Sequence, residues 1–448
     1  MGALRERAER TPASRERYID LLRATAIVLV VLGHWLISVL EYDERGELTG
    51  HSALESQPWA YPITWLVQVM PLFFIVGGYA NAASLTSHRR RGGDAATWLQ
   101  NRAGRLVPPT TTLLVVLAGS ALIARLSGAD PDLTRMAVWV ASIPLWFLSA
   151  YLVVVLLAPV MFRLHQHHGW RVPAVLVVLV GLGDLARLCG ADAWGDGNFV
   201  FGWLAIHQIG FAWQGGQLSF RPQLWLPLLV GGLAVVFLLT VPGPYSISMI
   251  DVSGQRMHNA SPPTLALLAD TAFQLGLVLM LRDPAERWLR RARPWQAVVA
   301  VNTVVLTVFL WHMSAVLLVV GLLNALDALP TPPAATAAWW LWRLPWLVML
   351  TVALTILVTI FGRIEVHGPR LAPAPCPPRL ERVVSTVSTP IPRLGLTLAA
   401  FAAVIAGLLS NNLTPRTGNY IVGMPASGLL TYLIGATALR LSRGCRPG

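Results

Sequence analysis

Long apolar segments recur along almost the whole chain, and this repetition restricts the fold more than any other feature. Twelve segments are long enough for an α-helix to cross the hydrocarbon core of a bilayer, which takes about 17 to 25 residues. They are predicted at 19–40, 60–86, 107–126, 136–162, 172–188, 200–219, 223–241, 263–281, 297–325, 337–361, 394–410 and 421–441. With 55% hydrophobic and 12% charged residues, the 448-residue chain is expected to fold as an all-α, polytopic transmembrane helical bundle.

Basic residues are distributed unevenly between the two sides of this predicted bundle. The net charge of +12 would suggest a nucleic-acid partner for a soluble protein, but here the arginines collect between the apolar segments. If the N-terminus is cytoplasmic, 26 of the 34 basic residues fall in cytoplasmic segments, as the positive-inside rule requires. We therefore predict cytoplasmic N- and C-termini, a lipid bilayer around the helices, and no nucleic-acid partner.

The polar segments suggest how the chain is divided. Residues 1–18 are predicted to form a cytoplasmic N-terminal tail, and residues 19–363 a transmembrane domain of about ten helices. Residues 364–393 are proline-rich and indicate a cytoplasmic linker, after which residues 394–448 form a final helix pair and a short tail. Because no polar segment is long enough for a soluble domain of useful size, any chemistry must take place within the helical bundle.

Several residue types that common catalytic groups require are missing or scattered. All 34 basic residues are arginine, which excludes a lysine nucleophile, a Schiff base and a P-loop. The three cysteines, Cys189, Cys376 and Cys445, are far apart and suggest neither a disulfide framework nor a thiolate site. The histidines in 165–168 have a metal-like composition, but the arginines around them favour a solvated surface, so no metal site is expected.

Polar side chains inside the first predicted span indicate a functional site. Arg23 and His34 are eleven residues apart, almost a whole number of helical turns, so they lie on one face about 16 Å apart along the axis. Asp20 lies one turn before Arg23 and can pair with it. Because exposure of this stripe to lipid would be costly, we expect it to face a cavity or other parts of the protein. The alternative is that His34 only forms a hydrogen bond to a neighbouring helix and that Arg23 extends its guanidinium to the membrane–water interface.

Two further histidines, His207 and His312, fall within predicted spans, at membrane depths that agree with His34 to within about 10 Å. Asp270 reaches a similar level in the eighth span, and Gln274 lies one turn further along it. We hypothesise that these side chains line one cavity, in which Asp270 or Gln274 orients a histidine. Separate hydrogen bonds between helices are an equally good explanation.

Five short segments follow one another in a specific order over residues 17–325. The first span, IDLLRATAIVLVVLGH, has Arg23 and His34 with ten residues between them. The second contains PLFFIVGGYANAASL, and the loop segment NRAGRLVPP carries Arg102 and Arg105 in an RxxR pattern. LWFLSAYLVVVLLAP and NTVVLTVFLWHM follow. Together these segments resemble the signature motifs of the acyltransferase-3 family of membrane proteins.

Three features depart from that family pattern. Gly77 stands where a serine is common in the second-span motif. Many members carry paired glutamates after the LWxLS segment, where this chain has Ala150, Tyr151 and Leu152, so no role for such acids can be transferred. Many bacterial members also append a soluble esterase-like domain, in whose place this chain has the terminal helix pair.

The resemblance implies transfer of an acyl group, often acetyl, from a coenzyme A thioester to a hydroxyl of a sugar, an envelope polymer or a small metabolite. Acyl-CoA, in particular acetyl-CoA, is then a donor co-substrate rather than a permanently bound cofactor. Arg102 and Arg105 are expected to bind its phosphates. The positive-inside rule alone explains the presence of these two arginines equally well. His34 is expected to act as the general base on the acceptor hydroxyl, with the donor's acyl-carrying arm along the Arg23 face.

Two other functions compete with this interpretation. A transporter of a small polar solute would also place polar residues in its spans, although the hydropathy pattern contains no inverted repeat. A flippase-like or assembly scaffold would not depend on His34. The arginine-only composition suggests a GC-rich genome and, by association, a bacterial plasma membrane as the location.

Overall fold

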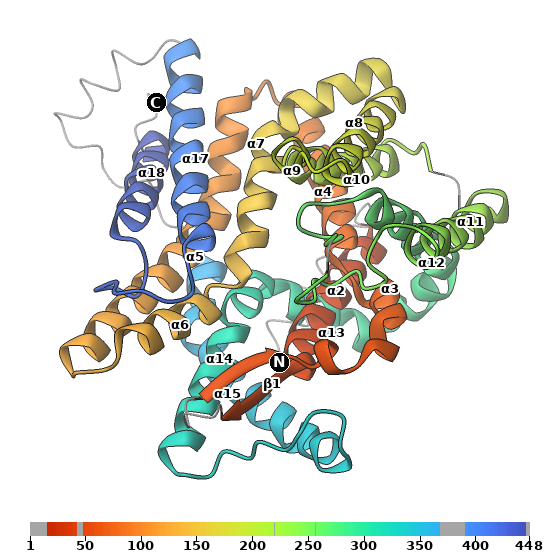
Figure 1. The fold of residues 1–448 in the computed structure, drawn as a ribbon. Helices are drawn as coiled ribbons and strands as arrows, with labels where there is room; N and C mark the ends of the chain where they lie inside the picture. Colours follow the sequence, from red (N-terminus) through yellow and green to blue (C-terminus); the bar gives the residue numbers. More distant parts are fainter. Residues whose placement is uncertain (1–15, 43–47, 219, 256, 368–389, 445–448) are drawn as a thin grey trace. The chain divides into compact units, whose positions relative to one another are not determined.

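Helices make up most of the computed structural model, which describes residues 16–42, 48–218, 220–255, 257–367 and 390–444 (Figure 1). Contacts divide the chain into two compact units. Unit 1 comprises Met1–Ser84, Val160–Thr303 and Pro330–Leu347, and unit 2 comprises Leu85–Pro159, Val304–Leu329 and Val348–Gly448. The division falls within three helices, α4 (Met70–Arg90), α7 (Pro144–His168) and α15 (Ala337–His367).

Unit 1 begins with α2, the helix of the first predicted span. Its elements in chain order, apart from the parts of the three divided helices, are α2 (Arg17–Ile37), β1 (Ser38–Tyr42), β2 (Leu48–Ser52), η1 (Ala53–Ser56), η2 (Pro58–Ile63), α3 (Thr64–Val67), α8 (Arg171–Leu188), α9 (Asp192–Gly195), α10 (Asn198–Gln214), α11 (Pro222–Thr240), α12 (Leu265–Leu289) and α13 (Ala292–Thr303). The two strands form an antiparallel hairpin in which Ser38 pairs with Ser52. A buried cluster of Ala24, Leu289, Trp295 and Val298 packs α2 against α12 and α13.

Glycines allow two helix pairs of unit 1 to approach very closely. On α11 and α12, a Cβ at Gly232 would lie 2.5 Å from the backbone nitrogen of Phe273, and one at Gly276 would lie 2.4 Å from that of Leu229. On α4 and α10, a Cβ at Gly78 would meet the His207 carbonyl oxygen. Small residues at such crossings are typical of helices that associate in a membrane, where close backbone packing replaces the hydrophobic effect.

Unit 2 contains the last turns of α4, the first half of α7, most of α15, and five further helices. These are α5 (Ala95–Leu126), α6 (Pro131–Ala141), α14 (Val305–Ala325), α17 (Pro390–Leu413) and α18 (Ala426–Gly444). The terminal pair α17–α18 lies side by side (Figure 1), with a contact at Gly407 too close for a Cβ beside Tyr432. The fully buried Arg135 of α6 binds the connection between these two helices, donating to carbonyl oxygens of Asn411, Pro415 and Gly423.

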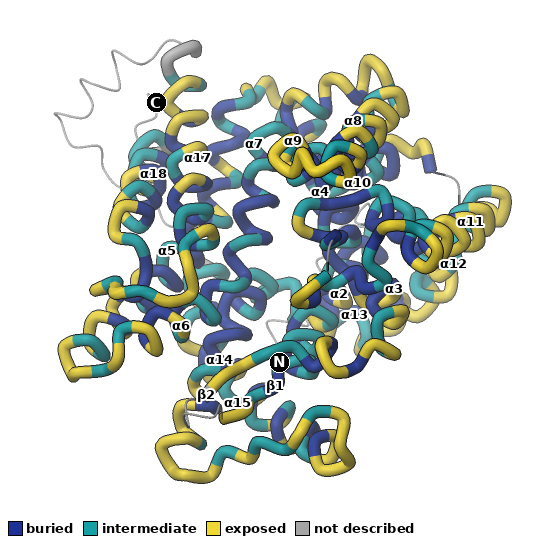
Figure 2. Tube along the Cα trace, in the orientation of Figure 1, coloured by how far each residue is buried: buried dark blue, intermediate teal, exposed yellow. Residues whose placement is uncertain are grey.

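Nine helices in the described ranges are long and apolar enough to cross a membrane, and they coincide with nine of the twelve predicted spans. The other three predicted spans are helical as well, as α8, α10 and α18. Along α11 the large apolar side chains are exposed (Figure 2), among them Leu226, Val230, Leu233, Phe237 and Leu238. Such a surface requires an apolar solvent, so the chain is a multi-pass membrane protein.

The start of α5 differs most from its predicted position. α5 begins at Ala95 rather than near residue 107, because Asp94 caps it with a carboxylate oxygen that accepts from Thr97 N at 2.7 Å. Arg102 and Arg105 therefore lie within a helix, about two and about three turns after its start.

Three other predicted boundaries differ. The predicted span 136–162 begins inside α6 and continues into α7, which starts at Pro144. The predicted span 297–325 consists of two helices, α13 and α14, that separate at Val304. Helices extend into both ends of the predicted linker 364–393, since α15 continues to His367 and α17 begins at Pro390. The rest of that linker, 368–389, and residues 1–15 of the predicted N-terminal tail lie outside the described residues.

Candidate active site

The N-terminal part of α2 is held by short polar contacts within unit 1. Arg23 Nη1 lies 3.5 Å from the Asp20 carboxylate, as the spacing of three residues predicts. Asn302 at the end of α13 donates to the Asp20 carbonyl oxygen at 2.8 Å. The Asp20 side chain is 7% exposed and that of Arg23 is 29% exposed, so the guanidinium remains accessible while its partner is buried.

The C-terminal end of α2, just beyond His34, is fixed by α15. Arg343 Nη1 donates to the carbonyl oxygens of Trp35 (3.3 Å) and Ser38 (2.9 Å), and Trp346 Nε1 donates to that of Trp35 (3.0 Å). The Ser38 hydroxyl donates to the His34 carbonyl oxygen at 2.6 Å. A cation at the last carbonyls of a helix also complements the helix dipole. The backbone that carries His34 is therefore rigidly placed.

The stripe of Arg23 and His34 lies on the packed side of α2, because Ile27 and Val31 follow Arg23 by four and eight residues on the same face. Thr25 and Val28 lie on the other side of the helix and are exposed. His34 and Arg23 are partly exposed, whereas Ile27, Val31 and Trp35 are buried at 5% exposure or less. Arg23 and His34 thus keep part of their surface accessible on a face that is otherwise packed. An imidazole with this accessibility can accept a proton from a bound substrate.

His207 lies in an interhelical contact between α10 and α4. It is fully buried, its Nε2 lies 3.1 Å from Asn81 Nδ2, and its ring packs edge-on against Phe211 at 4.7 Å between centroids. As an amide N–H can only donate, this contact places the His207 proton on Nδ1. Asn81 was not singled out from the sequence, because a single asparagine in a glycine- and alanine-rich span carries no spacing signal.

Asp270 and Gln274 form a second buried polar group, around the break between α3 and α4. Gln274 Nε2 donates to the carbonyl oxygens of Trp65 (2.9 Å) and Gln68 (2.8 Å) and to the Asp270 carboxylate (3.0 Å). Among the described residues this is the one side-chain hydrogen bond of Asp270, and it joins no histidine. A non-helical backbone break at membrane depth needs such donors from neighbouring side chains.

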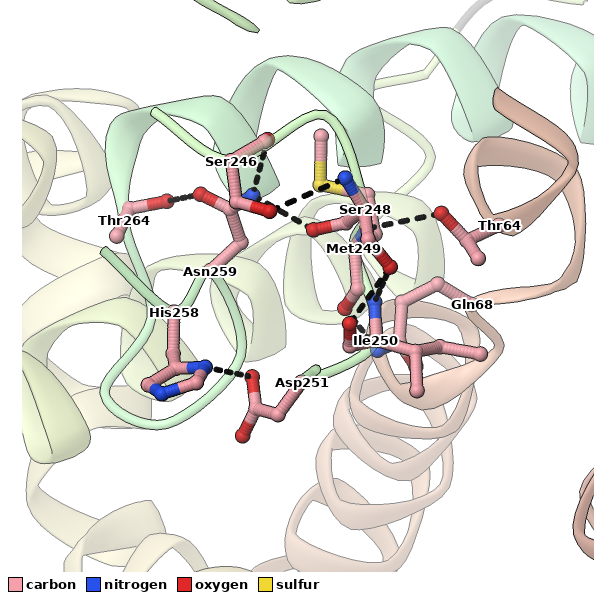
Figure 3. A network of polar contacts seen from close by, with 10 residues as sticks. All are labelled: Thr64, Gln68, Ser246, Ser248, Met249, Ile250, Asp251, His258, Asn259 and Thr264. Carbon is pink, nitrogen blue, oxygen red and sulfur yellow. Dashed lines mark hydrogen bonds and ion pairs between the residues drawn. The ribbon is translucent and has the colours of Figure 1, made fainter. Parts of the chain in front are cut away.

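The loop between α11 and α12 covers this break (Figure 3). Gln68 Nε2 donates to Met249 O at 2.7 Å, and Met249 N donates to the Thr64 hydroxyl at 2.8 Å. Asn259 ties the loop to itself by donating to the carbonyl oxygens of Ser246 and Ser248. The described part of this loop therefore packs on α3 and on the residues that follow it.

Asp184, near the end of α8, is a buried carboxylate that the sequence did not single out. It accepts from Leu265 N (2.8 Å), the Tyr245 hydroxyl (3.0 Å) and Asn198 Nδ2 (2.9 Å), and Arg187 lies 3.9 Å away. Burial and the neighbouring Asp184 charge raise the pKa of Tyr245, so it remains a hydroxyl donor. The available signal was Arg187 three residues after an acid in an apolar run. These bonds join α8, α10, α12 and the loop.

In unit 2, Arg102 and Arg105 lie in the first half of α5. Arg102 is partly exposed and stacks over Trp98 with 5.2 Å between guanidinium carbon and ring centroid, and Arg105 is exposed. Arg90 and Arg91, at the end of α4, are exposed as well, and a short turn connects α4 to α5. This end of unit 2 therefore carries a dense positive charge that can attract the phosphates of an anionic ligand.

His312 lies fully buried on α14, with its Nδ1 2.6 Å from the Phe309 carbonyl oxygen of the preceding turn. Because a carbonyl only accepts, this contact places the proton on Nδ1 and the lone pair on Nε2. The N-terminus of α14 is capped by Glu365, which accepts from Leu306 N (3.1 Å) and from the amide and hydroxyl of Thr307 (2.8 and 2.6 Å). The carboxylate thereby satisfies exposed helix donors.

The nine residues predicted for the site are thus distributed over both units. Asp20, Arg23, His34, His207, Asp270 and Gln274 lie in unit 1, whereas Arg102, Arg105 and His312 lie in unit 2. The contacts join Asp20 with Arg23 and Asp270 with Gln274. In the described part of the chain, no group of three or more histidine, cysteine, aspartate or glutamate side chains could hold a metal ion.

Comparison with known proteins gives one match. A family model of the acyltransferase-3 type, described as an acyltransferase domain, matches residues 16–362. This range includes α2, α5 and α14 and ends before the terminal pair α17–α18. No curated protein and no solved structure matches the chain.

Proposed function

Because the chain belongs to the acyltransferase-3 family, and is therefore a membrane acyltransferase, we propose that it transfers an acetyl group from acetyl-CoA to a hydroxyl group. The acceptor is a sugar, an envelope polymer or a small metabolite. The observation that carries the proposal is the accessible pair Arg23 and His34 on one membrane-spanning helix whose backbone is fixed at both ends. The family also favours an enzyme over a transporter or a noncatalytic scaffold.

The proposed reaction is a direct transfer without an acyl-enzyme. His34 accepts the proton of the acceptor hydroxyl as that oxygen attacks the thioester carbonyl. The tetrahedral intermediate then expels the thiolate of coenzyme A, which takes a proton from the His34 imidazolium. The new ester and free coenzyme A leave. Atoms and protons balance, and His34 returns to its neutral form.

The donor is proposed to bind through charge. Arg102 and Arg105 pair with phosphates of acyl-CoA, since a guanidinium forms bidentate hydrogen bonds with phosphate oxygens. The exposed side of α5 on which Arg105 lies supports this role. Arg23 is proposed to contact the donor's acyl-carrying arm, and Asp20 holds Arg23 in place at 3.5 Å.

The remaining predicted residues are proposed to line or support the substrate cavity. His312 presents an unprotonated Nε2 by virtue of its Nδ1 contact, which suits a hydrogen-bond acceptor. His207, Asp270 and Gln274 are proposed as supporting groups, because the bonds found for them tie helices together. Polar groups of this kind inside a membrane domain are costly unless structure or function retains them.

The topology extends beyond the nine candidate spans. We propose that α8, α10 and α18 also cross the bilayer, which gives twelve spans with both termini in the cytoplasm of a bacterial cell. The arginine distribution supports this orientation. We also propose that residues 19–363 form the acyltransferase domain and that residues 394–448 are an addition to it. Cysteine labelling from either side of spheroplasts, at positions in loops before and after α8, tests the topology.

The enzymatic proposal is tested by release of coenzyme A from acetyl-CoA. Purified protein in nanodiscs is given a pool of sugars, and both free thiol and acetylated product are measured. The proposal predicts equal amounts of the two products. Acetyl groups found only on the nitrogen of amino sugars, or binding of acetyl-CoA with no acetylated sugar at all, would contradict transfer to a hydroxyl.

A further inference from the structure

A small pocket lies beside the last residues of α2 within unit 1. Its volume is about 10 Å³ for the centre of a water-sized sphere, which is room for one oxygen atom or one water molecule. Its walls include Ser38, Val39, Leu40, Trp339, Arg343 and Trp346. A wider, open pocket of about 600 Å³ adjoins it, and the two share Pro330, Pro332 and Trp342. The arrangement is a narrow polar recess next to a broad apolar opening.

Two buried N–H donors in the wall of the small pocket lack an acceptor. Arg343 is 7% exposed and Trp339 is 2% exposed. In the described part of the chain, neither Arg343 Nε nor Trp339 Nε1 has a hydrogen-bond partner. An unsatisfied buried donor costs about 1 to 3 kcal/mol, so two of them in one pocket indicate a ligand that supplies acceptor atoms.

The charge of Arg343 narrows the class of that ligand. Its contacts are the carbonyl oxygens of Trp35 and Ser38 and the Trp339 ring, whose centroid lies 4.1 Å from the guanidinium carbon. All three partners are neutral, and within the described ranges no carboxylate forms an ion pair with Arg343. A buried cation without a counter-ion is costly, which favours an anion over a neutral acceptor.

The position of the pocket links it to the proposed chemistry. Ser38, in its wall, lies one helical turn beyond His34, or about 6 Å along the axis. The Ser38 hydroxyl is bonded to the His34 carbonyl oxygen, and the Ser38 carbonyl oxygen is bonded to Arg343. A ligand anchored by Arg343 would therefore lie close to the end of α2 that carries the proposed base.

We propose that this pocket is an oxyanion subsite for the acyl acceptor. A carboxylate or phosphate oxygen of the acceptor accepts the N–H groups of Arg343 and Trp339, and the rest of the acceptor lies against Trp342 in the wider pocket. The subsite rests on the proposed function, since it describes the substrate on which His34 acts. The acceptor is accordingly an acidic molecule that also bears a hydroxyl, such as an acidic sugar.

Binding is tested without turnover. The thermal unfolding of the protein in phosphatidylcholine nanodiscs is measured with methyl glucuronide and with methyl glucoside, which differ in one carboxylate. We expect the glucuronide alone to raise the unfolding temperature. Arg343→Gln and Trp339→Phe should lose the rise, and His34→Ala should keep it. Trp340→Phe is the matched control, because Trp340 is the next residue along the chain and is 49% exposed.

An equal rise with both sugars, no rise with either, or an unchanged rise in Trp339→Phe would overturn the proposal. Trp339→Phe keeps an aromatic ring beneath Arg343 but removes the N–H together with the rest of the five-membered ring, which leaves a small cavity. The rise is therefore measured against the unfolding temperature of each ligand-free variant. Nanodiscs with phosphatidylglycerol distinguish a lipid phosphate from an acceptor. If phosphatidylglycerol by itself raises the unfolding temperature and the glucuronide then adds no further rise, the pocket binds a lipid phosphate. That result would contradict the acceptor subsite.

Turnover separates this proposal from the proposed function. In wild type, kcat/KM for the glucuronide should exceed that for the glucoside by about tenfold or more, as for a hydrogen bond to a charged group. In Arg343→Lys and Trp339→Phe the ratio of the two kcat/KM values should fall toward one. A substitution that merely displaced His34 would instead lower kcat/KM for both sugars by the same factor. A glucuronide-dependent rise without any transfer would leave the subsite standing and contradict the proposed enzyme reaction.

Discussion

Gly232 of α11 lies so close to Phe273 of α12 that a Cβ on the glycine would be 2.5 Å from the Phe273 nitrogen. Gly231, the adjacent residue, has open space where its Cβ would be. The two positions share helix, depth and residue type, and differ only in the face on which they lie. They therefore form a matched pair for testing how the α11–α12 contact depends on glycine.

Gly232→Val is expected to destabilise the protein by about 1 to 3 kcal/mol or more, because the added atoms force the two helices apart. Gly231→Val adds the same atoms toward open space and should change stability by less than about 0.5 kcal/mol. Thermal unfolding in detergent measures both. Equal effects of the two substitutions would contradict the packing described for α11 and α12.

Removal of the Arg135 charge should lower the free energy of unfolding of unit 2. Arg135 is fully buried and donates five hydrogen bonds to the segment around the α17–α18 connection, including one to Asn411 Oδ1 at 2.9 Å. Arg135→Gln leaves several of those acceptors unpaired, so a loss of about 2 to 5 kcal/mol is expected. Arg416→Gln, which removes a cation–π contact with Trp139, is the control. Proteolysis of the α17–α18 connection reports the local effect.

The Asp94 cap of α5 makes the stability of the folded protein depend on pH in a predictable direction. Burial by itself raises the pKa of Asp94, but hydrogen bonds from Thr97 and the charge of Arg393 outweigh it and hold the pKa below its ordinary value. A depressed folded-state pKa means that Asp94 stabilises the fold above its unfolded pKa of about 3.9. That contribution is lost as the pH falls through the folded pKa.

Asp94→Ala should therefore cost about 1 kcal/mol near neutral pH, as for the loss of a helix N-cap. Because the side chain is 53% exposed, solvent screening keeps the ionic part small. The difference in unfolding temperature between wild type and Asp94→Ala should shrink on acidification to about pH 3, below the unfolded pKa. A difference that grows as the pH falls would contradict a lowered Asp94 pKa in the folded protein.

Replacement of the α5 arginines tests the proposed donor site. Arg102→Gln with Arg105→Gln should raise KM for acetyl-CoA at least tenfold and leave KM for the acceptor unchanged, because charged hydrogen bonds to the donor phosphates are removed. Added salt should weaken donor binding in wild type more than in the variant. Arg440→Gln on α18 serves as the control. An acceptor KM that rises as steeply as the donor KM would exclude this assignment.

The sequence was informative wherever periodicity or spacing carried the signal. Helices occur at all twelve predicted spans, and the spacing of three residues between Asp20 and Arg23 predicted their contact. The family resemblance, based on five motifs, is confirmed by the match over residues 16–362. Helix starts were less predictable, since α5 begins at a single capping residue, Asp94, that lies outside the apolar run.

Partners distant in sequence could not be inferred at all. Arg343 bonds to Ser38 across 305 residues, and Asn81 contacts His207 across 126. A single sequence contains no signal for such pairs, because each depends on how helices pack and not on any local pattern. The same holds for Asp184 and Glu365, whose several hydrogen bonds each join distant parts of the chain.

The assignment of His34 as the base is the central claim, and turnover of a single variant tests it most directly. Release of coenzyme A from acetyl-CoA is measured for wild type, His34→Ala and His168→Ala, the last being a histidine at the end of α7, outside the packed core. Loss of a general base typically lowers the rate by about 10² to 10⁴. We predict such a loss in His34→Ala and wild-type turnover in His168→Ala; a kcat for His34→Ala within about twofold of wild type would contradict the account.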